Sequence, residues 1–252
     1  MPTHRDPRPR SQQIAADLRA DIMSGDIAAD SYLSSTAELS ARYRASGATI
    51  QNAVSILKAE GYVEGEPGKG VKVRPTRQQT ITPADYATLP ADGQPYAWIT
   101  AAAERGQRGA YRLLAVAEVP APIQVARAFS VDPGSPVVRR AQLGTHNDEP
   151  VELVHTFYPI SLARGTALAV KRLIKGGSQV VLAELGAEPV SFEDVISTRP
   201  PTSEEFVALD LPTEVPILRT FRVAVSAAGQ PVECQVMVKS GHRHEVRYRW
   251  PS

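Results

Sequence analysis

Apolar residues recur at helical spacing in three short segments near the N-terminus. In the first segment, Ile14, Leu18 and Ile22 fall on one side of a predicted helix over 11–24, and Gly25 ends that helix. A spacing of three to four residues gives a helix one apolar face, and a neighbouring element must cover that face. The pattern therefore predicts a small helical core at the start of the chain.

Two further helices complete this predicted core. One is expected over 36–43 and the next over roughly 47–60, with a short turn between them. In the third helix Ile50, Val54 and Leu57 form the stripe that should be buried. Two short helices joined by a tight turn are typical of a helix-turn-helix.

The segment that follows alternates apolar and polar residues on both sides of a glycine-rich turn. It predicts two strands over 62–64 and 71–74. Gly65, Gly68 and Gly70 permit the positive backbone angles that a tight hairpin requires. A helix-turn-helix followed by such a hairpin predicts a winged DNA-binding domain, with one helix in the major groove.

The buried stripe of the third helix decides which of its polar side chains point outward. Gln51 and Asn52 can pair bidentately with adenine, while Ser46 and Thr49 can bind phosphate at the helix N-terminus. For each residue alone, the alternative is an ordinary solvated side chain. The residues expected to contact DNA are Thr36, Arg42, Arg44, Ser46, Ala48, Thr49, Gln51, Asn52, Lys69 and Gly70.

The remainder of the chain predicts a linker and a strand-rich second domain. Proline occurs four times in residues 75–95, where large apolar residues are few. We therefore expect a DNA-binding domain over 1–75, a linker over 76–95, and an effector-binding and dimerisation domain over 96–252. In that domain the pattern predicts strands at 111–119, 136–143, 150–158, 190–198, 216–226, 231–239 and 244–250, and helices at 96–104, 122–129, 167–173, 178–185 and 203–209. The expected fold class is α+β with an antiparallel sheet.

Charge and composition narrow the class of protein. Residues 1–76 carry ten basic and nine acidic side chains, so one head is nearly neutral and should bind phosphate weakly by itself. Cys234 is the only cysteine in the 252 residues, which excludes an intramolecular disulfide and a cysteine-based zinc site. The pair His242 and His244 has no third ligand at a suitable spacing, so no metal or other cofactor is expected. Without a long apolar run or an export signal, we expect a cytoplasmic protein.

Motifs for catalysis are absent from the sequence. It contains no G-x-S-x-G, no P-loop and no G-x-G-x-x-G after a predicted strand. The glycines at 65, 68 and 70 belong to the predicted hairpin. The sequence therefore favours a binding protein over an enzyme.

The first domain resembles the winged-helix head of GntR-type bacterial transcriptional regulators. The resemblance is carried by the segments SQQIAADLRADIMSGDI, LSSTAELSARY and SGATIQNAVSILKAEGYVEGEPGKGVKV. Three arginines that the family uses for DNA binding are replaced here by Ala37, Gly47 and Gln51. Either the operator is read differently, or the affinity for DNA is reduced.

The second domain resembles the effector-binding domain of the HutC subfamily, which shares its fold with chorismate lyase. The matching segments are DPGSPVVRR, EPVELVHTFYP and VPILRTFRVAVSAAGQPVE. The resemblance implies a small, often anionic effector held by an arginine pair, of which Arg140 is present and Gln142 replaces the second. The expected effector-binding residues are Arg140, Gln142, Thr156, Glu193, Arg222 and Glu233.

Three functional hypotheses follow. The first is a ligand-responsive repressor that binds double-stranded DNA as a homodimer at a palindromic operator. The second is a small-molecule sensor whose DNA-binding head has degenerated, as the missing arginines suggest. The third is a chorismate-lyase-like enzyme, which the shared fold alone would imply. Binding to heterologous duplex at two salt concentrations separates the first two, and turnover of aromatic carboxylates would reveal the third.

Overall fold

The chain folds into two compact units. The computed structural model describes residues 6–75, 79–82, 97–104, 106, 108–212 and 215–249. The first unit spans Met1–Gln78 and the second spans Gln79–Ser252. Within the described residues, no helix is long and apolar enough to cross a membrane.

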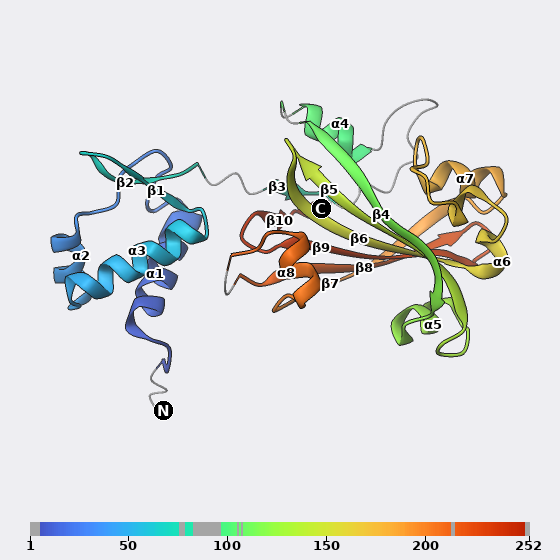
Figure 1. The fold of residues 1–252 in the computed structure, drawn as a ribbon, viewed down its shortest axis with the longest axis horizontal. Coiled ribbons are helices and arrows are strands. Elements are labelled where there is room, and N and C mark those ends of the chain that lie inside the picture. The colour runs from blue at the N-terminus through green and yellow to red at the C-terminus, as the bar shows by residue number, and fades with distance from the viewer. Residues whose placement is uncertain are drawn as a thin grey trace. The chain divides into compact units, whose positions relative to one another are not determined.

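The first unit contains three helices and a two-stranded hairpin (Figure 1). Its elements are α1 (Arg10–Ser24), α2 (Thr36–Tyr43), α3 (Gly47–Ala59), β1 (Val63–Glu66) and β2 (Gly70–Val73). The predicted winged helix-turn-helix is therefore confirmed. Helix α1 ends as expected at Gly25, whose φ of 87° is in the left-handed region that suits glycine.

Local hydrogen bonds set where α2 and α3 begin. The hydroxyl of Ser35 accepts a hydrogen bond from the amide of Glu38, whose carboxylate in turn accepts one from the amide of Ser35. Ser46 caps α3 by accepting from the amide of Thr49 at 3.2 Å. These caps fix the first turn of each helix.

The core of the first unit joins the three helices to the hairpin. Ile14, Leu18, Ile50 and Leu57 are fully buried and pack in one cluster with Val73 of β2. The expected stripe of α3 needs one correction. Ala53 takes the fully buried position between Ile50 and Leu57, whereas Val54 is half-buried at the margin. One face of α3 is thereby fixed inward and the other is left open.

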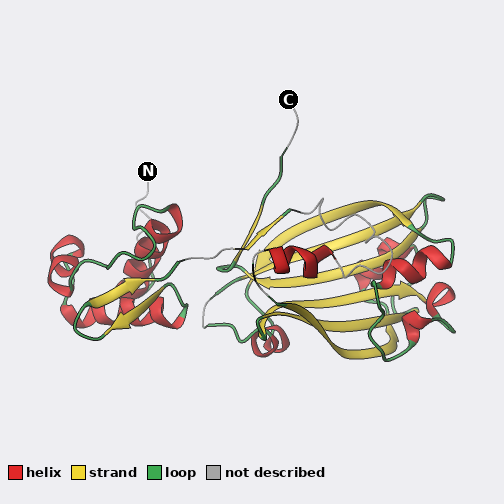
Figure 2. Ribbon diagram, turned by 90° about the horizontal axis from the view of Figure 1, so that it is seen from above, coloured by secondary structure: helices red, strands yellow, loops and turns green. Residues whose placement is uncertain are grey.

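The second unit is built on a six-stranded antiparallel sheet in the order β4-β5-β6-β9-β8-β7 (Figure 2). Its strands are β4 (Gly109–Pro120), β5 (Pro136–His146), β6 (Glu149–Pro159), β7 (Pro189–Arg199), β8 (Ile217–Ser226) and β9 (Pro231–Ser240). The helical elements are α4 (Ala97–Glu104), α5 (Ile123–Phe129), α6 (Ile160–Ala163), η2 (Ala167–Ala169), α7 (Ser178–Glu184) and α8 (Ser203–Ala208). The expected α+β class is confirmed.

Helices cover the two faces of this sheet differently. On one face α5 packs with Phe157, Phe221 and Cys234, and α8 packs near Leu153 and Val238. On the other face α6, η2 and α7 cover one end of the sheet through a separate cluster. Because side chains alternate along a strand, neighbouring residues of one strand serve opposite faces. The part of the second face that these helices leave uncovered forms the floor of a cavity.

Two short strands close the other end of that face. Strand β3 (Gln79–Ile81) pairs in parallel with β10 (His244–Val246). Residues 79–81 were expected to belong to the linker, and the last strand was expected over 244–250. Both expectations are corrected by this pairing, which joins segments far apart in the chain and therefore has no local signature.

The predicted helix over 167–173 is wrong beyond a single turn. Only η2 forms there, because the carbonyl oxygens of Ala167, Leu168, Val170 and Arg172 accept hydrogen bonds from the Arg140 guanidinium. Carbonyls that point at one side chain cannot all point along a helix axis. The loop is therefore shaped by Arg140 from β5.

Candidate functional sites

The outer flank of α3 carries the residues expected to read base edges. Ala48, Gln51 and Asn52 are exposed, whereas Ile50 and Ala53 on the inner flank are fully buried. The amide side chains therefore point away from the core of the first unit. A helix exposed on one flank in this way can enter a major groove.

The hydroxyls at the start of α3 are partly committed to each other. The side-chain oxygens of Ser46 and Thr49 are 2.9 Å apart, and Thr49 is half-buried. Either hydroxyl can still accept or donate a second hydrogen bond. Thr36, the first residue of α2, is also exposed.

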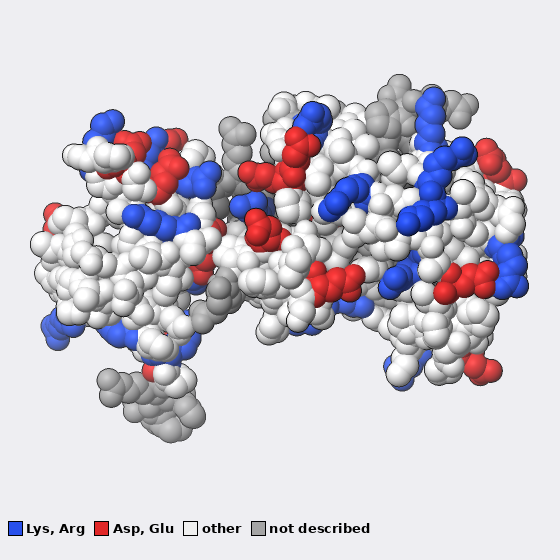
Figure 3. Space-filling view, in the orientation of Figure 1, with Lys and Arg blue, Asp and Glu red and all other residues white. Residues whose placement is uncertain are grey.

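The cations of the first unit are largely paired with carboxylates. Arg42 donates to Asp21 at 3.0 Å, and the Lys69 ammonium lies 3.4 Å from Glu66. Figure 3 shows basic and acidic side chains interspersed over the hairpin. Arg44 is exposed and ends α2 in a left-handed conformation. This head therefore offers little concentrated positive charge, in agreement with its near-neutral composition.

Gly70 shapes the hairpin through its backbone. Its φ of 119° favours glycine, and a Cβ at this position would lie 3.8 Å from the Tyr32 ring. The hydroxyl of Tyr32 donates to Glu66 at 2.6 Å, which ties the hairpin to the segment before α2. Within this hairpin, Lys69 is the exposed side chain suited to the phosphate backbone.

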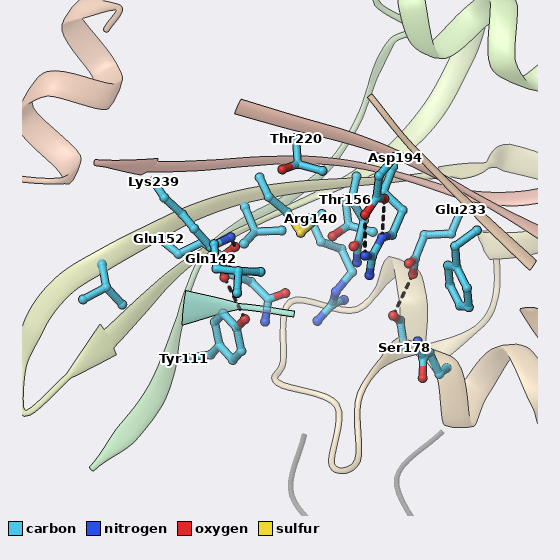
Figure 4. Close-up of a pocket in the computed structure, with 18 of the residues that line it drawn as sticks. Tyr111, Arg140, Gln142, Glu152, Thr156, Ser178, Asp194, Thr220, Glu233 and Lys239 are labelled. Carbon is cyan, nitrogen blue, oxygen red and sulfur yellow. Dashed lines mark hydrogen bonds and ion pairs between the residues drawn. The ribbon is translucent and has the colours of Figure 1, made fainter. Parts of the chain in front are cut away.

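The second unit contains a cavity of about 140 Å³ on the sheet face that α7 and β10 leave open. Side chains from β5, β6, β7, β8 and β9 form its floor, and β3, β10 and the loop before α7 form its rim. Figure 4 shows that the labelled polar side chains converge on this space. Polar groups from five strands thus meet at one point.

One row of polar residues crosses the floor in register. The paired positions, from β5 to β7, are Arg140, Thr156, Gln235, Arg222 and Asp194. Residues opposite each other on neighbouring strands have side chains on the same face. The antiparallel register therefore brings together residues that are far apart in the sequence.

Arg222 and Asp194 form a two-pronged ion pair at the end of this row. The guanidinium Nε and Nη2 donate to the two carboxylate oxygens at 2.7 Å each. Both side chains are largely buried, and the guanidinium lies 5.3 Å from the centre of the Phe192 ring. Parallel hydrogen bonds of this kind fix both groups in one geometry.

Two other acidic side chains in the cavity are also held by neighbours. Glu152 pairs with the Lys239 ammonium and accepts a hydrogen bond from Tyr111 at 3.1 Å. Glu233 accepts from the Ser178 hydroxyl at 2.7 Å. Burial raises the pKa of Glu233, which favours its uncharged form, although hydrogen bonds from Ser178 and Tyr158 oppose this.

Five of the six expected effector-binding residues line the cavity, namely Arg140, Gln142, Thr156, Arg222 and Glu233. The expectation for Glu193 is wrong, because it is exposed on the opposite face of the sheet beside Phe221. Its neighbour Asp194 enters the cavity instead. A register shift between Pro189 and Ser191 means that the pattern near the start of β7 does not indicate which face each residue takes.

Sequence reasoning also missed cavity residues that period-two alternation on β9 would have indicated. Once Glu233 is placed inward, Gln235, Met237 and Lys239 must follow on the same face. The same alternation on β6 places Glu152 on the face of Thr156, whereas Tyr111 and Ser178 carry no comparable local signal. Within the described residues, no group of three or more histidine, cysteine or acidic side chains is arranged to hold a metal ion.

Comparison with known proteins agrees with both units. Residues 10–73 match the model for bacterial regulatory proteins of the gntR family, and residues 104–245 match the model for the UTRA domain. The chain belongs to the gntR family of regulators. It joins a GntR helix-turn-helix to a ligand-binding UTRA domain, and the members of this family are transcriptional regulators rather than enzymes.

The relatives of this GntR regulator match it along most of its length. It is 24% identical over 223 residues to the uncharacterized HTH-type transcriptional regulator RB1450 of Rhizobium meliloti (strain 1021), covering 88% of this chain and 87% of the relative. It is 22% identical over 236 residues to the uncharacterized HTH-type regulator YurK of Bacillus subtilis (strain 168), covering 92% and 91%. The crystal structure of PhnF from Mycobacterium smegmatis matches its fold with a TM-score of 0.57 at 19% identity, covering 95% and 99%.

Proposed function

We propose that this GntR regulator represses transcription as a homodimer bound to a roughly palindromic operator, and that a small molecule in the UTRA cavity controls this binding. The observation that carries the proposal is the exposed pair Gln51 and Asn52 on α3, a helix whose opposite flank is fully buried. In this proposal both amides read base edges in the major groove.

Around these amides, the proposal assigns the remaining expected residues to the DNA backbone. Ser46 and Thr49 bind phosphate at the N-terminus of α3, and Lys69 binds the backbone beside the groove. Arg42 and Arg44 lie at the end of α2, within the same helix-turn-helix. Ion pairing of Arg42 with Asp21 and of Lys69 with Glu66 means that DNA phosphates must compete with carboxylates.

The weak charge of one head supports a dimer. Phosphate neutralisation supplies most of the affinity of a DNA-binding protein, and this head has almost no net positive charge. Two linked heads gain affinity through effective concentration, and two-fold symmetry matches a palindromic site. As a DNA-binding regulator, the protein is proposed to act in the cytoplasm.

Control by the effector requires a difference in affinity between two states of the dimer. A ligand in the cavity shifts the equilibrium between operator-bound and free protein only as far as it prefers one of them. In this proposal, binding of the effector releases the protein from the operator.

The test is DNase footprinting of the full-length protein on the DNA upstream of its own gene and the neighbouring genes. We expect one protected site with two half-sites about one helical turn apart, and sedimentation should give two chains per site. Protection of a single half-site by one chain would contradict the dimer. If deleting the gene for this protein lowered transcription of the neighbouring genes, repression would be contradicted.

A second function is supported by Ala37, Gly47 and Gln51, which stand where the family has arginines. These replacements and the paired cations are consistent with a small-molecule sensor whose head binds DNA only weakly. Affinity for a heterologous duplex separates the two functions. A functional head should lose affinity steeply between about 50 and 200 mM salt, whereas a degenerate head should show little binding at either concentration.

A further inference from the structure

The charged groups in the UTRA cavity all have partners inside the protein. Arg222 is paired with Asp194 and Lys239 with Glu152. The Arg140 guanidinium donates to four carbonyl oxygens of residues 167–172, at 2.6 to 3.3 Å. The cation that a carboxylate or phosphate ligand would need is therefore already engaged by the loop.

The third acidic side chain of the cavity is also held by another group of the protein. Glu233 is 2% exposed and is held by Ser178. Burial raises the pKa of its carboxyl, while hydrogen bonds from Ser178 and Tyr158 and the charge of Arg222 oppose that shift. Each charged side chain of the cavity is thus already held by other groups of the protein.

By contrast, four neutral polar side chains on the strands of the cavity floor, like Gln179 on α7, have no side-chain hydrogen bond with any other described residue. These side chains are Gln142, Thr156, Thr220 and Gln235, and all four line the cavity. Thr156 is buried and the other three are half-buried, and polar groups in such positions normally have partners because an unmade hydrogen bond costs free energy. Here the groups that remain available are all uncharged.

These four residues surround an apolar centre. Thr156 is opposite Gln235 in one row, and in the next row Val154 is opposite Met237. Gln142 flanks Val154 on one side, and Thr220 flanks Met237 on the other. The floor is therefore an apolar platform edged by donors and acceptors. It suits a saturated ring whose faces are C–H groups and whose rim carries hydroxyls.

The size of the cavity limits the ring. Its volume of about 140 Å³ is close to that of an engineered cavity of ~150 Å³ that binds benzene. A single six-membered ring fits this space, and its substituents can reach the partly open mouth. A nucleotide or a long acyl chain is too large.

We propose that the effector is an uncharged, hydroxyl-bearing six-membered ring of monosaccharide or cyclitol size, resting on Val154 and Met237. It is recognised by the amides of Gln142 and Gln235 and the hydroxyls of Thr156 and Thr220. The assignment rests on the proposed function in that this ligand is the one that controls DNA binding. A carboxylate or phosphate on the ligand would have to compete for Arg140 with the loop carbonyls, and for Arg222 and Lys239 with their paired carboxylates.

The test is thermal unfolding of the full-length protein with matched neutral and phosphorylated probes. The neutral probes are D-glucose, D-galactose, D-mannose and myo-inositol, and the charged ones are glucose 6-phosphate, mannose 6-phosphate and inorganic phosphate. At 100 times its Kd, a neutral probe should raise Tm by about 5 °C, and the phosphates should raise it less. The assignment would be overturned if only the phosphates raised Tm, or if none of the four neutral probes raised it.

Two variants show whether such a shift comes from the cavity. Thr220→Val and Gln235→Leu each keep the side-chain size and remove one polar group, so the shift should shrink at least threefold in either. Glu193→Gln, on the opposite face, should respond like the parent. Sugars also stabilise proteins by exclusion from the surface, so an equal shift in parent and both variants would refute specific binding. DNA retention by the same samples is read separately by gel shift, so loss of the proposed DNA-binding function would be recognised independently.

Discussion

The Arg222 guanidinium and the Asp194 carboxylate face each other across β8 and β7 with two hydrogen bonds of 2.7 Å. Because both side chains are largely buried, removing one leaves the other charge without compensation. Asp194→Ala should therefore destabilise the UTRA domain by about 3–5 kcal/mol, whereas the double variant Asp194→Leu/Arg222→Met should lie much closer to the parent. Urea unfolding followed by circular dichroism checks this. Equal loss in the single and double variants would show that the pair is not coupled.

Arg140 should control the order of the loop between α6 and α7. Replacing it with methionine removes the donor for carbonyls of residues 167–172, so their backbone should open more often. We expect amide exchange in Ala167–Ala169 to become at least about tenfold faster, since each hydrogen bond to a charged group contributes about 1.5–3 kcal/mol. Hydrogen exchange measured by mass spectrometry checks this. Arg139→Met, next to it on β5, is the matched control, and equal acceleration in both variants would contradict the assignment.

Stability of the UTRA domain should fall as the pH drops below about 6.5. Burial, and then the nearby Lys239, lower the pKa of His244 to about 3, and its neutral imidazole bonds the Ser240 carbonyl at 3.0 Å. In the unfolded chain His244 is protonated near its ordinary pKa of 6.5, whereas in the folded chain it stays neutral until the pH approaches 3. The stabilisation is thus complete above pH 6.5 and is lost toward pH 3, at up to about 1.4 kcal/mol per pH unit.

Calorimetry from pH 7.5 to 5 measures that slope. Burial also lowers the pKa of His155, which adds in the same direction. His244→Gln should remove the contribution of His244 and flatten the profile, while the parent keeps it. Identical profiles for the parent and the variant would show that His244 titrates normally in the folded protein.

Elements that depend on local signals could be predicted from the sequence, and those that depend on distant contacts could not. Gly25 at the end of α1, and Gly68 and Gly70 in the hairpin turn, all with positive φ, are local signals, and they predicted the elements around them. The parallel pairing of β3 with β10 depends on contacts between distant segments, so no local pattern announced it.

The cavity shows the same division. The family resemblance grouped Arg140 with Gln142, and both line the cavity from one face of β5. The adjacent carboxylates Glu193 and Asp194 are equally polar, and only the register of β7 against β8 decides that Asp194 points inward. The carbonyl partners of Arg140 are also invisible locally, because they lie 27 to 32 residues further along the chain.

Base discrimination should depend on the exposed flank of α3. The double variant Gln51→Ala/Asn52→Ala should lose about 1–3 kcal/mol of preference for the operator over mismatched DNA for each bidentate contact removed. Lys69→Ala should instead weaken binding to all duplexes alike and reduce the salt slope by about 1. Gel-shift titrations with matched and mismatched operators check both. Ser55→Ala, further along α3, is the control, and unchanged specificity in the double variant would refute the contacts.

Restoring the arginines of the family should strengthen DNA binding. Gly47 begins α3, and a Cβ added there would meet only the Thr36 methyl at 3.6 Å, an ordinary van der Waals contact. Gln51 is exposed on the same helix, so Gly47→Arg/Gln51→Arg should fold without strain. Each arginine that reaches a phosphate should steepen the dependence of log K on log salt by about 0.9.

The measurement is binding to a heterologous duplex at several salt concentrations. Gly47→Ala/Gln51→Ala is the control, because it changes the same positions without adding charge. A steeper slope in the arginine variant alone would mean that the missing arginines limit phosphate contact in this head. An unchanged slope would mean that α3 approaches DNA in another orientation, since two added cations at its N-terminal half would then be out of reach of the phosphates.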